Sequence, residues 1–200
     1  MIEITAAINI LPYEGESVYF GKIFSLQQSA AYLQYFLQDI PWKNDEAIIF
    51  GKHFITARKV AWYGNENYAY TYSNKTRVAL PWIQPLLEIK KVVEQVTGVA
   101  YNSCLLNLYQ DGSQGMGWHH DDEKGLGKDA NIASLSFGAE RRFDMRHKLN
   151  KEKISIILAH GSLLVMRGTT QSNWHHQLPK SKKITSPRVN LTFRTMLGSA

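Results

Sequence analysis

After Gly98 the sequence divides into seven short segments of strand-like composition, and this feature constrains the fold more than any other. Turns that contain Gly, Asn or Lys separate the segments, which span residues 102–110, 116–121, 131–137, 141–147, 154–158, 162–167 and 187–196. Strands of this length at this spacing are typical of a β-sandwich or β-barrel. A chain of 200 residues, 44% of them hydrophobic, is long enough for one such core and too short for two full domains. We therefore predict a single, mainly β domain.

Two helices are expected before these strands. Ser25 and Gln28 form a capping-box pattern, and apolar residues then recur at helical spacing as far as Ile40. Pro85 suits the first turn of a second helix, and Gly98 suits its C-terminal end. The expected fold class is α+β, mainly β, with these helices packed outside the strands.

Amino-acid composition indicates the cellular compartment of the protein and the charge of its partner. The single cysteine, Cys104, excludes an intramolecular disulfide and a cysteine-based zinc site, which fits a reducing intracellular compartment. The chain has neither a secretory signal pattern at its start nor a run of about eighteen apolar residues, so we expect a soluble protein with no membrane partner. The formal net charge of +6 favours a polyanionic partner without identifying it.

Imidazoles and carboxylates gather in residues 118–122, at a spacing that suits a metal ion. Side chains two residues apart in a strand share a face, so the strand presents either His119 with Asp121 or His120 with Asp122. A third ligand is available from the histidine pair at 175–176. Two histidines and one carboxylate, with the opposite positions open, are the ligand set of non-haem Fe(II) oxygenases. The spacing leaves both registers open.

The segment 188–194 alternates polar and apolar residues without exception. Its polar face carries Arg188, Asn190, Thr192 and Arg194. Arginine binds carboxylates through two parallel hydrogen bonds, so a small dicarboxylate held beside the metal would account for this face. An exposed edge strand is the alternative. Asn107 and Tyr109 also share a strand face and could offer an amide and a phenol to the same ligand.

Taken in order, these segments resemble the AlkB-type Fe(II)/2-oxoglutarate-dependent dioxygenases, which reverse alkylation damage in nucleic acids. The similarity extends back to about Phe50 and is greatest to the branch that repairs duplex DNA. It rests on the motifs Asn107-x-Tyr109-x-Asp111-Gly112, Gly117-x-His119-x-Asp121-Asp122-Glu123, Ser134-x-Ser136-Phe137-Gly138-Ala139, His160-Gly161-Ser162-Leu163-Leu164, Trp174-x-His176-x-Leu178-Pro179 and Arg188-Val189-Asn190-Leu191-Thr192-Phe193-Arg194.

The resemblance implies a fold, a ligand set and co-substrates. The fold would be a double-stranded β-helix, or jelly roll, formed by residues 99–200, with residues 1–98 supplying the helices and a substrate-recognition region. Iron would be held by His119, Asp121 and His176, which leaves His120 and His175 as non-ligands. Fe(II) would act with O2 and 2-oxoglutarate as co-substrates. The 2-oxoglutarate pocket would consist of Asn107, Tyr109, Arg188, Asn190, Thr192 and Arg194, with Arg188 at the far carboxylate.

The chemistry implied by the resemblance is oxidative demethylation of DNA bases such as 1-methyladenine and 3-methylcytosine. Hydroxylation of the methyl carbon releases formaldehyde, and 2-oxoglutarate becomes succinate. These methylated bases are cationic, so a pocket of aromatic faces and a carboxylate would select them. Tyr70, Tyr72 and Glu123 occupy the corresponding family positions, with His119 as the opposite wall. Tyr72 stands where duplex-repair relatives often have Phe, which puts the lesion preference in doubt.

A base inside a duplex must be flipped out to reach such a pocket. Phe50, in the apolar segment 48–51, is a candidate wedge that would fill the vacated space, although a buried strand would explain the segment equally well. The candidate phosphate contacts are basic side chains in two regions: Arg141, Arg142, Arg146, His147 and Lys148, and Lys180, Lys182 and Lys183. We expect a monomer that acts on alkylated DNA, duplex or single-stranded, with RNA as a further candidate substrate. Its expected location is the cytoplasm, or the nucleus if the source is eukaryotic.

Three alternatives remain open from the sequence. The same chemistry could act on single-stranded DNA or RNA, or on etheno adducts. A zinc hydrolase could use the same two histidines and one aspartate, but it leaves the arginines of segment 188–194 unexplained. A non-catalytic jelly roll that binds nucleic acid is the third.

Overall fold

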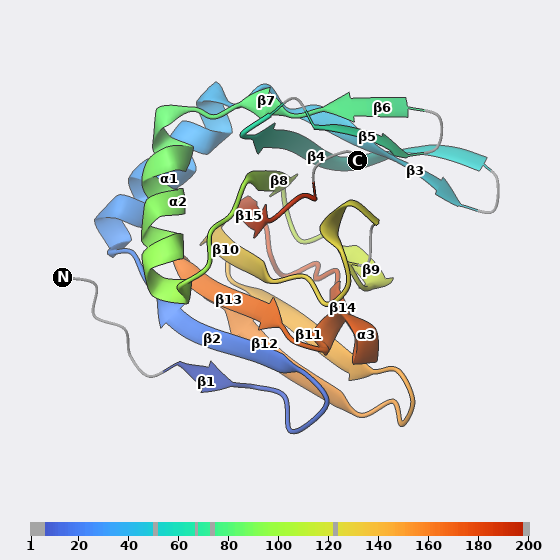
Figure 1. The fold of residues 1–200 in the computed structure, drawn as a ribbon. Coiled ribbons are helices and arrows are strands. Elements are labelled where there is room, and N and C mark those ends of the chain that lie inside the picture. Colours follow the sequence, from blue (N-terminus) through green and yellow to red (C-terminus); the bar gives the residue numbers. More distant parts are fainter. Residues whose placement is uncertain (1–6, 50–51, 67, 73–74, 122–123, 198–200) are drawn as a thin grey trace.

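The computed structural model describes residues 7–49, 52–66, 68–72, 75–121 and 124–197. Its strands form two main sheets that face each other, with two long helices against the outer side of the larger sheet (Figure 1). The described helices are α1 (Leu26–Asp39), α2 (Gln84–Thr97) and the short α3 (Thr170–Asn173), with a 3-10 turn at Lys124–Leu126. This arrangement confirms the predicted fold, a double-stranded β-helix with helices outside it.

Antiparallel pairing dominates both sheets. In the described residues the larger sheet has the order β1 (Ile8–Asn9), β2 (Glu16–Lys22), β13 (Ser162–Arg167), β10 (Ile132–Gly138), β15 (Arg188–Arg194), β8 (Ser103–Tyr109), β4 (Lys52–Gly64) and β3 (Lys43–Ile49), with β7 (Leu80–Pro81) beside β4. The smaller sheet has the order β12 (Lys153–Leu158), β11 (Arg141–His147), β14 (Trp174–Leu178) and β9 (Met116–His119). A separate hairpin joins β5 (Ala69–Tyr72) to β6 (Lys75–Val78).

Both predicted helices form for the reasons that the sequence suggests. The Ser25 side chain accepts from the Gln28 backbone N–H, and the Gln28 side chain accepts from the Ser25 N–H, so the capping box is complete. Gly98 ends α2 with a left-handed backbone (φ 70°), which glycine adopts without a steric penalty. No helix in the described part of the chain is long and apolar enough to cross a membrane.

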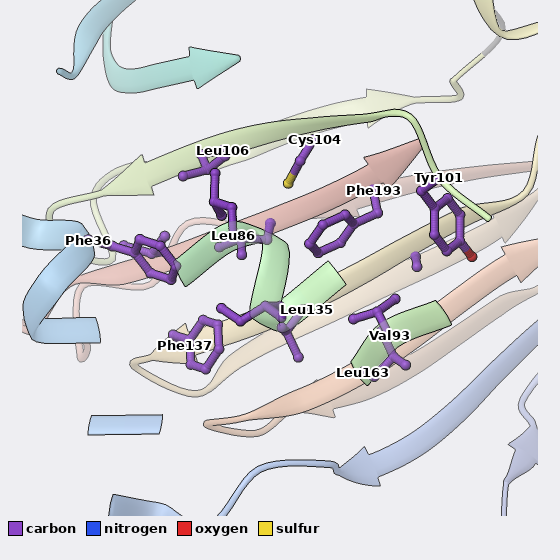
Figure 2. Close-up of a cluster of buried hydrophobic side chains, with 14 of the residues drawn as sticks. Phe36, Leu86, Val93, Tyr101, Cys104, Leu106, Leu135, Phe137, Leu163 and Phe193 are labelled. Atoms are coloured by element: carbon purple, nitrogen blue, oxygen red, sulfur yellow. The ribbon is translucent and has the colours of Figure 1, made fainter. Parts of the chain in front are cut away.

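A hydrophobic core fills the space between the two long helices and the larger sheet. Side chains on the outer face of β10 and β15, such as Leu135 and Phe193, are fully buried against Phe36 of α1 and Leu86 of α2 (Figure 2). Truncating a fully buried leucine such as Leu135 to alanine typically costs about 2–5 kcal/mol of unfolding free energy. This packing fixes the outer face of each strand and, because side chains alternate, turns the polar residues of the same strands to the inner face.

A second core lies between the two sheets. Ile132 and Leu164 of the larger sheet pack with Phe143, Met145 and other side chains of the smaller sheet. The polar face of β15 points into this space, and β15 itself lies between β10 and β8. The alternative of an exposed edge strand is therefore wrong: the arginines of β15 face the interior between the sheets.

Two strands differ from the sequence predictions. β14 was not predicted, because its five residues Trp-His-His-Gln-Leu place three polar residues in a row and show no alternation of polar and apolar residues. β2 lies outside the seven segments predicted above, and it pairs with β13 along its length. Both strands are stabilised by hydrogen bonds to strands that are distant in the sequence. Local sequence patterns carry no information about such partners.

Candidate metal and co-substrate site

Three potential metal ligands meet at one end of the smaller sheet. His119 is the last residue of β9, Asp121 follows two residues later, and His176 is the central residue of β14. The pairing of β9 with β14 places His119 directly opposite His176. Asp121 Oδ1 lies 3.8 Å from His119 Nε2, and Asp121 Oδ2 lies 4.0 Å from His176 Nε2. All three ligand atoms lie within 4.8 Å of one another, so the group could hold one metal ion.

Both histidines are in a form that suits a metal ligand. His119 Nδ1 is 2.8 Å from the Gly117 carbonyl oxygen, which can only accept, so Nδ1 is the donor in this contact and Nε2 is the nitrogen turned toward Asp121. His176 is only 3% exposed, and burial together with the neighbouring His119 lowers the pKa of His176 to about 3. Its imidazole is therefore neutral near pH 7, the state from which a nitrogen binds a metal.

The carboxylate of the group is fixed from two directions. The Asp121 backbone N–H donates to Gln171 Oε1 at 2.9 Å, which ties the residue to α3. Arg194 Nη2 donates to Asp121 Oδ2 at 3.3 Å. Burial alone would raise the pKa of Asp121, but Arg194 and the nearby histidines lower it below its usual value. Asp121 is thus a buried anion, which a cation between the two histidines would neutralise.

The structure distinguishes the two registers that the spacing left open. His120 and His175 lie on the other face of the smaller sheet, with their ring centroids 5.1 Å apart, and they belong to no metal-ligand group among the described residues. The set of His119, Asp121 and His176 is the one that the structure brings together.

Opposite the triad, the inner face of the larger sheet carries a buried arginine. Arg188 is 3% exposed, and its Nη2 donates to Ser136 Oγ at 2.9 Å. Burial, with a smaller contribution from the nearby Arg141, lowers the pKa of Arg188 to about 10, so the guanidinium still carries its charge near pH 7. Its Nε has no partner, and no carboxylate is among the contacts of Arg188 in the described part of the chain. A buried cation of this kind requires an anionic partner, and the far carboxylate of 2-oxoglutarate fits that need.

Neighbouring polar side chains on β15 are already hydrogen-bonded within the sheet. Asn190 Nδ2 donates to Ser134 Oγ at 2.9 Å and to the Leu135 carbonyl at 3.0 Å. Thr192 Oγ1 donates to Asn190 Oδ1 at 3.2 Å. Asn190 and Thr192 are therefore held in fixed orientations on the wall that Arg188 also lines.

Asn107 and Tyr109 lie beside this wall on β8. Pairing of β8 with β15 places Asn107 opposite Asn190 and Tyr109 opposite Arg188. The Arg188 guanidinium carbon lies 5.6 Å from the centre of the Tyr109 ring. The structure thus brings together all six residues predicted for the 2-oxoglutarate pocket, although Arg194 contacts the metal ligand Asp121 at the other end of the row.

Several residues of this region were given no role in the site from the sequence. Ser134 and Ser136 alternate on β10 in the same way as the polar residues of β15, and that alternation could have indicated them. The sequence around Gln171 and Arg58 contains no comparable pattern. Each residue contacts the site from a segment whose local sequence does not indicate that it lies near the site.

Two of the predicted phosphate contacts, Arg141 and His147, are wrong because both side chains are buried. Arg141 is 1% exposed, and its Nη2 donates to the carbonyl oxygens of Gln114 and Pro179 at 2.8 Å and 2.9 Å. Its position at the first residue of β11, on the inward-facing side of that strand, explains why it is buried while Arg142 is exposed. Arg141 supports the loop between β8 and β9 and cannot reach a phosphate from there. His147, also named as a contact, is 3% exposed and binds Glu14 Oε2 through Nε2.

The other predicted phosphate contacts reach the surface. Arg142 makes an ion pair with Asp144, Arg146 lies 4.2 Å above the Trp118 ring, and Lys148 donates to the Gln171 carbonyl. Lys182 and Lys183, like Lys180, are in the connection between β14 and β15. Gly112 holds this connection in place through two backbone hydrogen bonds, to Ser181 and Ile184. A side chain at Gly112 would overlap the Ser181 carbonyl oxygen.

Four predicted substrate-contact residues lie beyond what the structure describes. Phe50 and Glu123 are outside the described residues. For Tyr70 and Tyr72 the backbone is described, as part of β5, but the side chains are not. Their roles remain predictions from the resemblance.

Two histidines and one aspartate, of which Asp121 and His176 are buried, face a buried arginine between the sheets of a double-stranded β-helix. This arrangement is typical of a non-haem iron oxygenase that uses an anionic co-substrate. Sequence comparison agrees: the family described as the 2OG-Fe(II) oxygenase superfamily matches residues 16–194. The chain belongs to this superfamily, and its triad and Arg188 fit the Fe(II) and the 2-oxoglutarate from which the superfamily takes its name.

Individual relatives place the chain more narrowly. It is 42% identical over 174 residues to the human alpha-ketoglutarate-dependent dioxygenase alkB homolog 3, covering 82% of this chain and 60% of that protein. It is 45% identical over 157 residues to the human DNA oxidative demethylase ALKBH2, covering 74% and 60%. The chain thus spans about three fifths of the length of these relatives. A solved structure described as "The structure of OsALKBH1" shares the fold, with a TM-score of 0.63 at 16% identity over 90% of this chain and 97% of that one.

Proposed function

We propose that this protein removes methyl groups from alkylated DNA bases by oxidation, with 1-methyladenine and 3-methylcytosine as substrates. The observation that supports this most directly is the triad of potential iron ligands opposite the buried Arg188, in a chain whose relatives include proteins named DNA oxidative demethylases. The oxidative chemistry of the superfamily sets the zinc-hydrolase alternative aside.

The protein's own residues bind and orient the reactants. His119, Asp121 and His176 would hold the iron, and Arg188 would bind the far carboxylate of 2-oxoglutarate. When bound, iron and 2-oxoglutarate use O2 to hydroxylate the methyl carbon, with 2-oxoglutarate converted to succinate and CO2. Loss of formaldehyde from the hydroxylated carbon then restores the base, so no nucleophile from the protein is needed.

Of the three ligands, His119 is the most accessible, with 29% of its side chain exposed, against 8% for Asp121 and 4% for His176. This difference indicates the side from which a base can approach. The ring of His119 would form one wall of the base pocket, and Tyr70, Tyr72 and Glu123 would supply aromatic and anionic groups for a cationic methylated base. Because a paired base cannot reach the site, the substrate nucleotide would have to leave the stack.

The β3–β4 hairpin is the candidate element for that step. Its strands pair up to Ile49 and Lys52, and Phe50 falls between these two residues in the sequence. If Phe50 fills the vacated space, Phe50→Ala reduces demethylation of duplex DNA and leaves activity on the matched single strand unchanged. Equal loss on both substrates, or no loss on duplex, would contradict this role.

The central test measures succinate formation from 2-oxoglutarate with Fe(II) and ascorbate, with and without an oligonucleotide that contains 1-methyladenine. We expect the methylated oligonucleotide to stimulate succinate formation and to lose its methyl group, and His176→Ala to abolish both. His175→Ala, which changes the adjacent histidine on the other face of the sheet, is the matched control. Stimulation by unmethylated DNA alone would refute the proposed substrate.

Matched single-stranded DNA, duplex DNA and RNA, each with a methyl or etheno lesion, determine which form the enzyme prefers. Repair that persists in the double variant His119→Ala/Asp121→Ala would instead support a non-catalytic protein that binds nucleic acid.

A further inference from the structure

Arg58 connects the base of the β3–β4 hairpin to the 2-oxoglutarate pocket. It lies on β4, which pairs with β8, and its side chain is only 15% exposed. Its Nη1 donates to Asn107 Oδ1 at 3.0 Å, and its guanidinium is near enough to the Tyr109 hydroxyl to interact with it. Nothing in the motifs of the sequence assigns a role to this residue, yet it contacts both β8 residues of the pocket.

These contacts determine what Asn107 and Tyr109 can offer a ligand. When Asn107 Oδ1 accepts from Arg58, the opposite end of the amide presents only N–H donors. When the Tyr109 oxygen accepts from Arg58, its own O–H proton is free to donate elsewhere. Both side chains are thereby set as donors toward the space between the sheets, which is the arrangement that a carboxylate requires.

Asp45 holds Arg58 in this position. The two side chains form an ion pair, and Asp45 is itself 6% exposed. Asp45 lies where the register between β3 and β4 shifts, between Asn44 and Glu46. A β-bulge of this kind redirects a side chain, here toward the interior of the sheet. Bound to the Asp45 carboxylate, the buried guanidinium of Arg58 does not compete with Arg188 for the co-substrate anion.

We propose that Arg58 is a positioning residue for 2-oxoglutarate, which orients the Asn107 amide and the Tyr109 hydroxyl as donors and is itself held by Asp45. This inference rests on 2-oxoglutarate being the co-substrate of the proposed function. It does not depend on the nucleic acid, so it can be tested without any DNA. A failure of the demethylation assay would therefore leave it standing.

The test is calorimetric titration of 2-oxoglutarate into protein loaded with Mn(II), a redox-inert substitute for Fe(II). We expect Arg58→Met to weaken 2-oxoglutarate binding about tenfold. Without Arg58, the Asn107 amide and the Tyr109 hydroxyl are no longer held in the orientation in which they donate to the ligand, so both hydrogen bonds become weaker. Arg58→Lys should recover part of the affinity, and Asp45→Asn should show a smaller loss. The affinity for Mn(II) should stay the same in every variant, since none of these residues is a metal ligand.

Asn44→Ala is the matched control on the same hairpin. Asn44 Nδ2 donates to the Thr56 carbonyl at 3.1 Å, so this change removes a hairpin contact without touching Arg58. It should bind 2-oxoglutarate like the unmodified protein. An equal loss in Asn44→Ala and Asp45→Asn would show that the hairpin as a whole, and not Arg58, affects the pocket, and would overturn the proposal.

A double-mutant cycle separates positioning from a general structural effect. If Arg58 acts through Asn107, then Arg58→Met has little further effect on 2-oxoglutarate affinity in an Asn107→Ala background. In steady-state turnover the KM for 2-oxoglutarate should rise while kcat is retained. Additive losses in the cycle, or unchanged 2-oxoglutarate affinity in Arg58→Met and Asp45→Asn, would refute the proposal. If Arg58→Met does not fold, Arg58→Lys and Asp45→Asn provide the same comparison.

Discussion

Each of the two sheets contributes half of the site. The halves differ in how far hydrogen bonds within the folded protein already fix the side chains that would bind a ligand. On the larger sheet, Arg188, Asn190 and Thr192 are hydrogen-bonded to one another or to β10. On the smaller sheet, Asp121 Oδ1 and Oδ2 lie 3.8 Å and 4.0 Å from the Nε2 atoms of His119 and His176, which is too far for hydrogen bonds between the ligands. The co-substrate wall is thus preorganised, whereas the metal half is completed only by its ion.

The largest expected effect tests the metal half. His176→Ala should weaken Fe(II) or Mn(II) binding about 100-fold or more and abolish turnover, because it removes the most buried ligand. Metal should raise the Tm of the unmodified protein by mass action and leave the Tm of the variant unchanged. Calorimetric titration and thermal unfolding with and without EDTA measure this. An equal metal-dependent rise of Tm in the variant would show that the triad is not the metal site.

The next effect tests the co-substrate half. Arg188→Met should weaken 2-oxoglutarate binding about 10–100-fold, since a charge-assisted hydrogen bond contributes about 1.5–3 kcal/mol. The free energy of unfolding of the ligand-free protein should be unchanged or higher, because the variant no longer buries an unpaired cation. Urea unfolding beside calorimetric titration checks both. A loss of stability as large as the loss of binding would contradict the view that Arg188 is held for a ligand.

A third prediction concerns the outer face of the smaller sheet. Asp144 is fully buried there and accepts from Ser155 and Gln177, with Arg142 and Lys153 beside it. Burial would raise the pKa of Asp144, but these partners lower it below the usual value. Asp144→Asn should therefore cost about 1–3 kcal/mol of unfolding free energy at pH 7.

The pH dependence of that cost has a definite sign. Because the pKa of Asp144 is lower in the folded than in the unfolded chain, its stabilisation is complete above the unfolded value of about 3.9 and is lost as the pH falls through the folded value. The difference in urea midpoint between Asp144→Asn and the unmodified protein should shrink below about pH 4. A difference that stays constant with pH would show that packing, not charge, determines it.

The smallest expected effect concerns the connection between the sheets. Lys182→Ala/Lys183→Ala should reduce the log–log salt dependence of DNA binding by about 0.9 for each phosphate that is no longer neutralised, without changing turnover on saturating substrate. Fluorescence anisotropy over a range of salt concentrations measures the slope. Lys151→Ala, which changes an exposed lysine in the turn between β11 and β12, is the control. An equal reduction there would remove any special role of the β14–β15 connection.

Local patterns in the sequence predicted the helices and most strands because their signals, caps and alternation, act over a few residues. The alternation of β15 also predicted a polar face that the structure turns inward. Spacing alone could not choose between His119 and His120, because the choice depends on which face of the β9–β14 pair points toward the larger sheet. Arg141 was wrongly expected at the surface for a similar reason. Its charge suggests solvent exposure, but its place in the alternation of β11 turns its side chain inward. Arg58 could not be found at all, because only the pairing of β4 with β8 brings it to Asn107.

The order of the strands has a consequence for how the chain is made. β14 and β15 come last among the described strands, yet β14 lies between β11 and β9, and β15 lies between β10 and β8. While the chain grows from the ribosome, both sheets therefore lack an interior strand until residues 174–194 have emerged. Neither half of the site can assemble on a shorter chain. A chain that stalls or terminates before this point should expose both unpaired sheet interiors to proteases and chaperones.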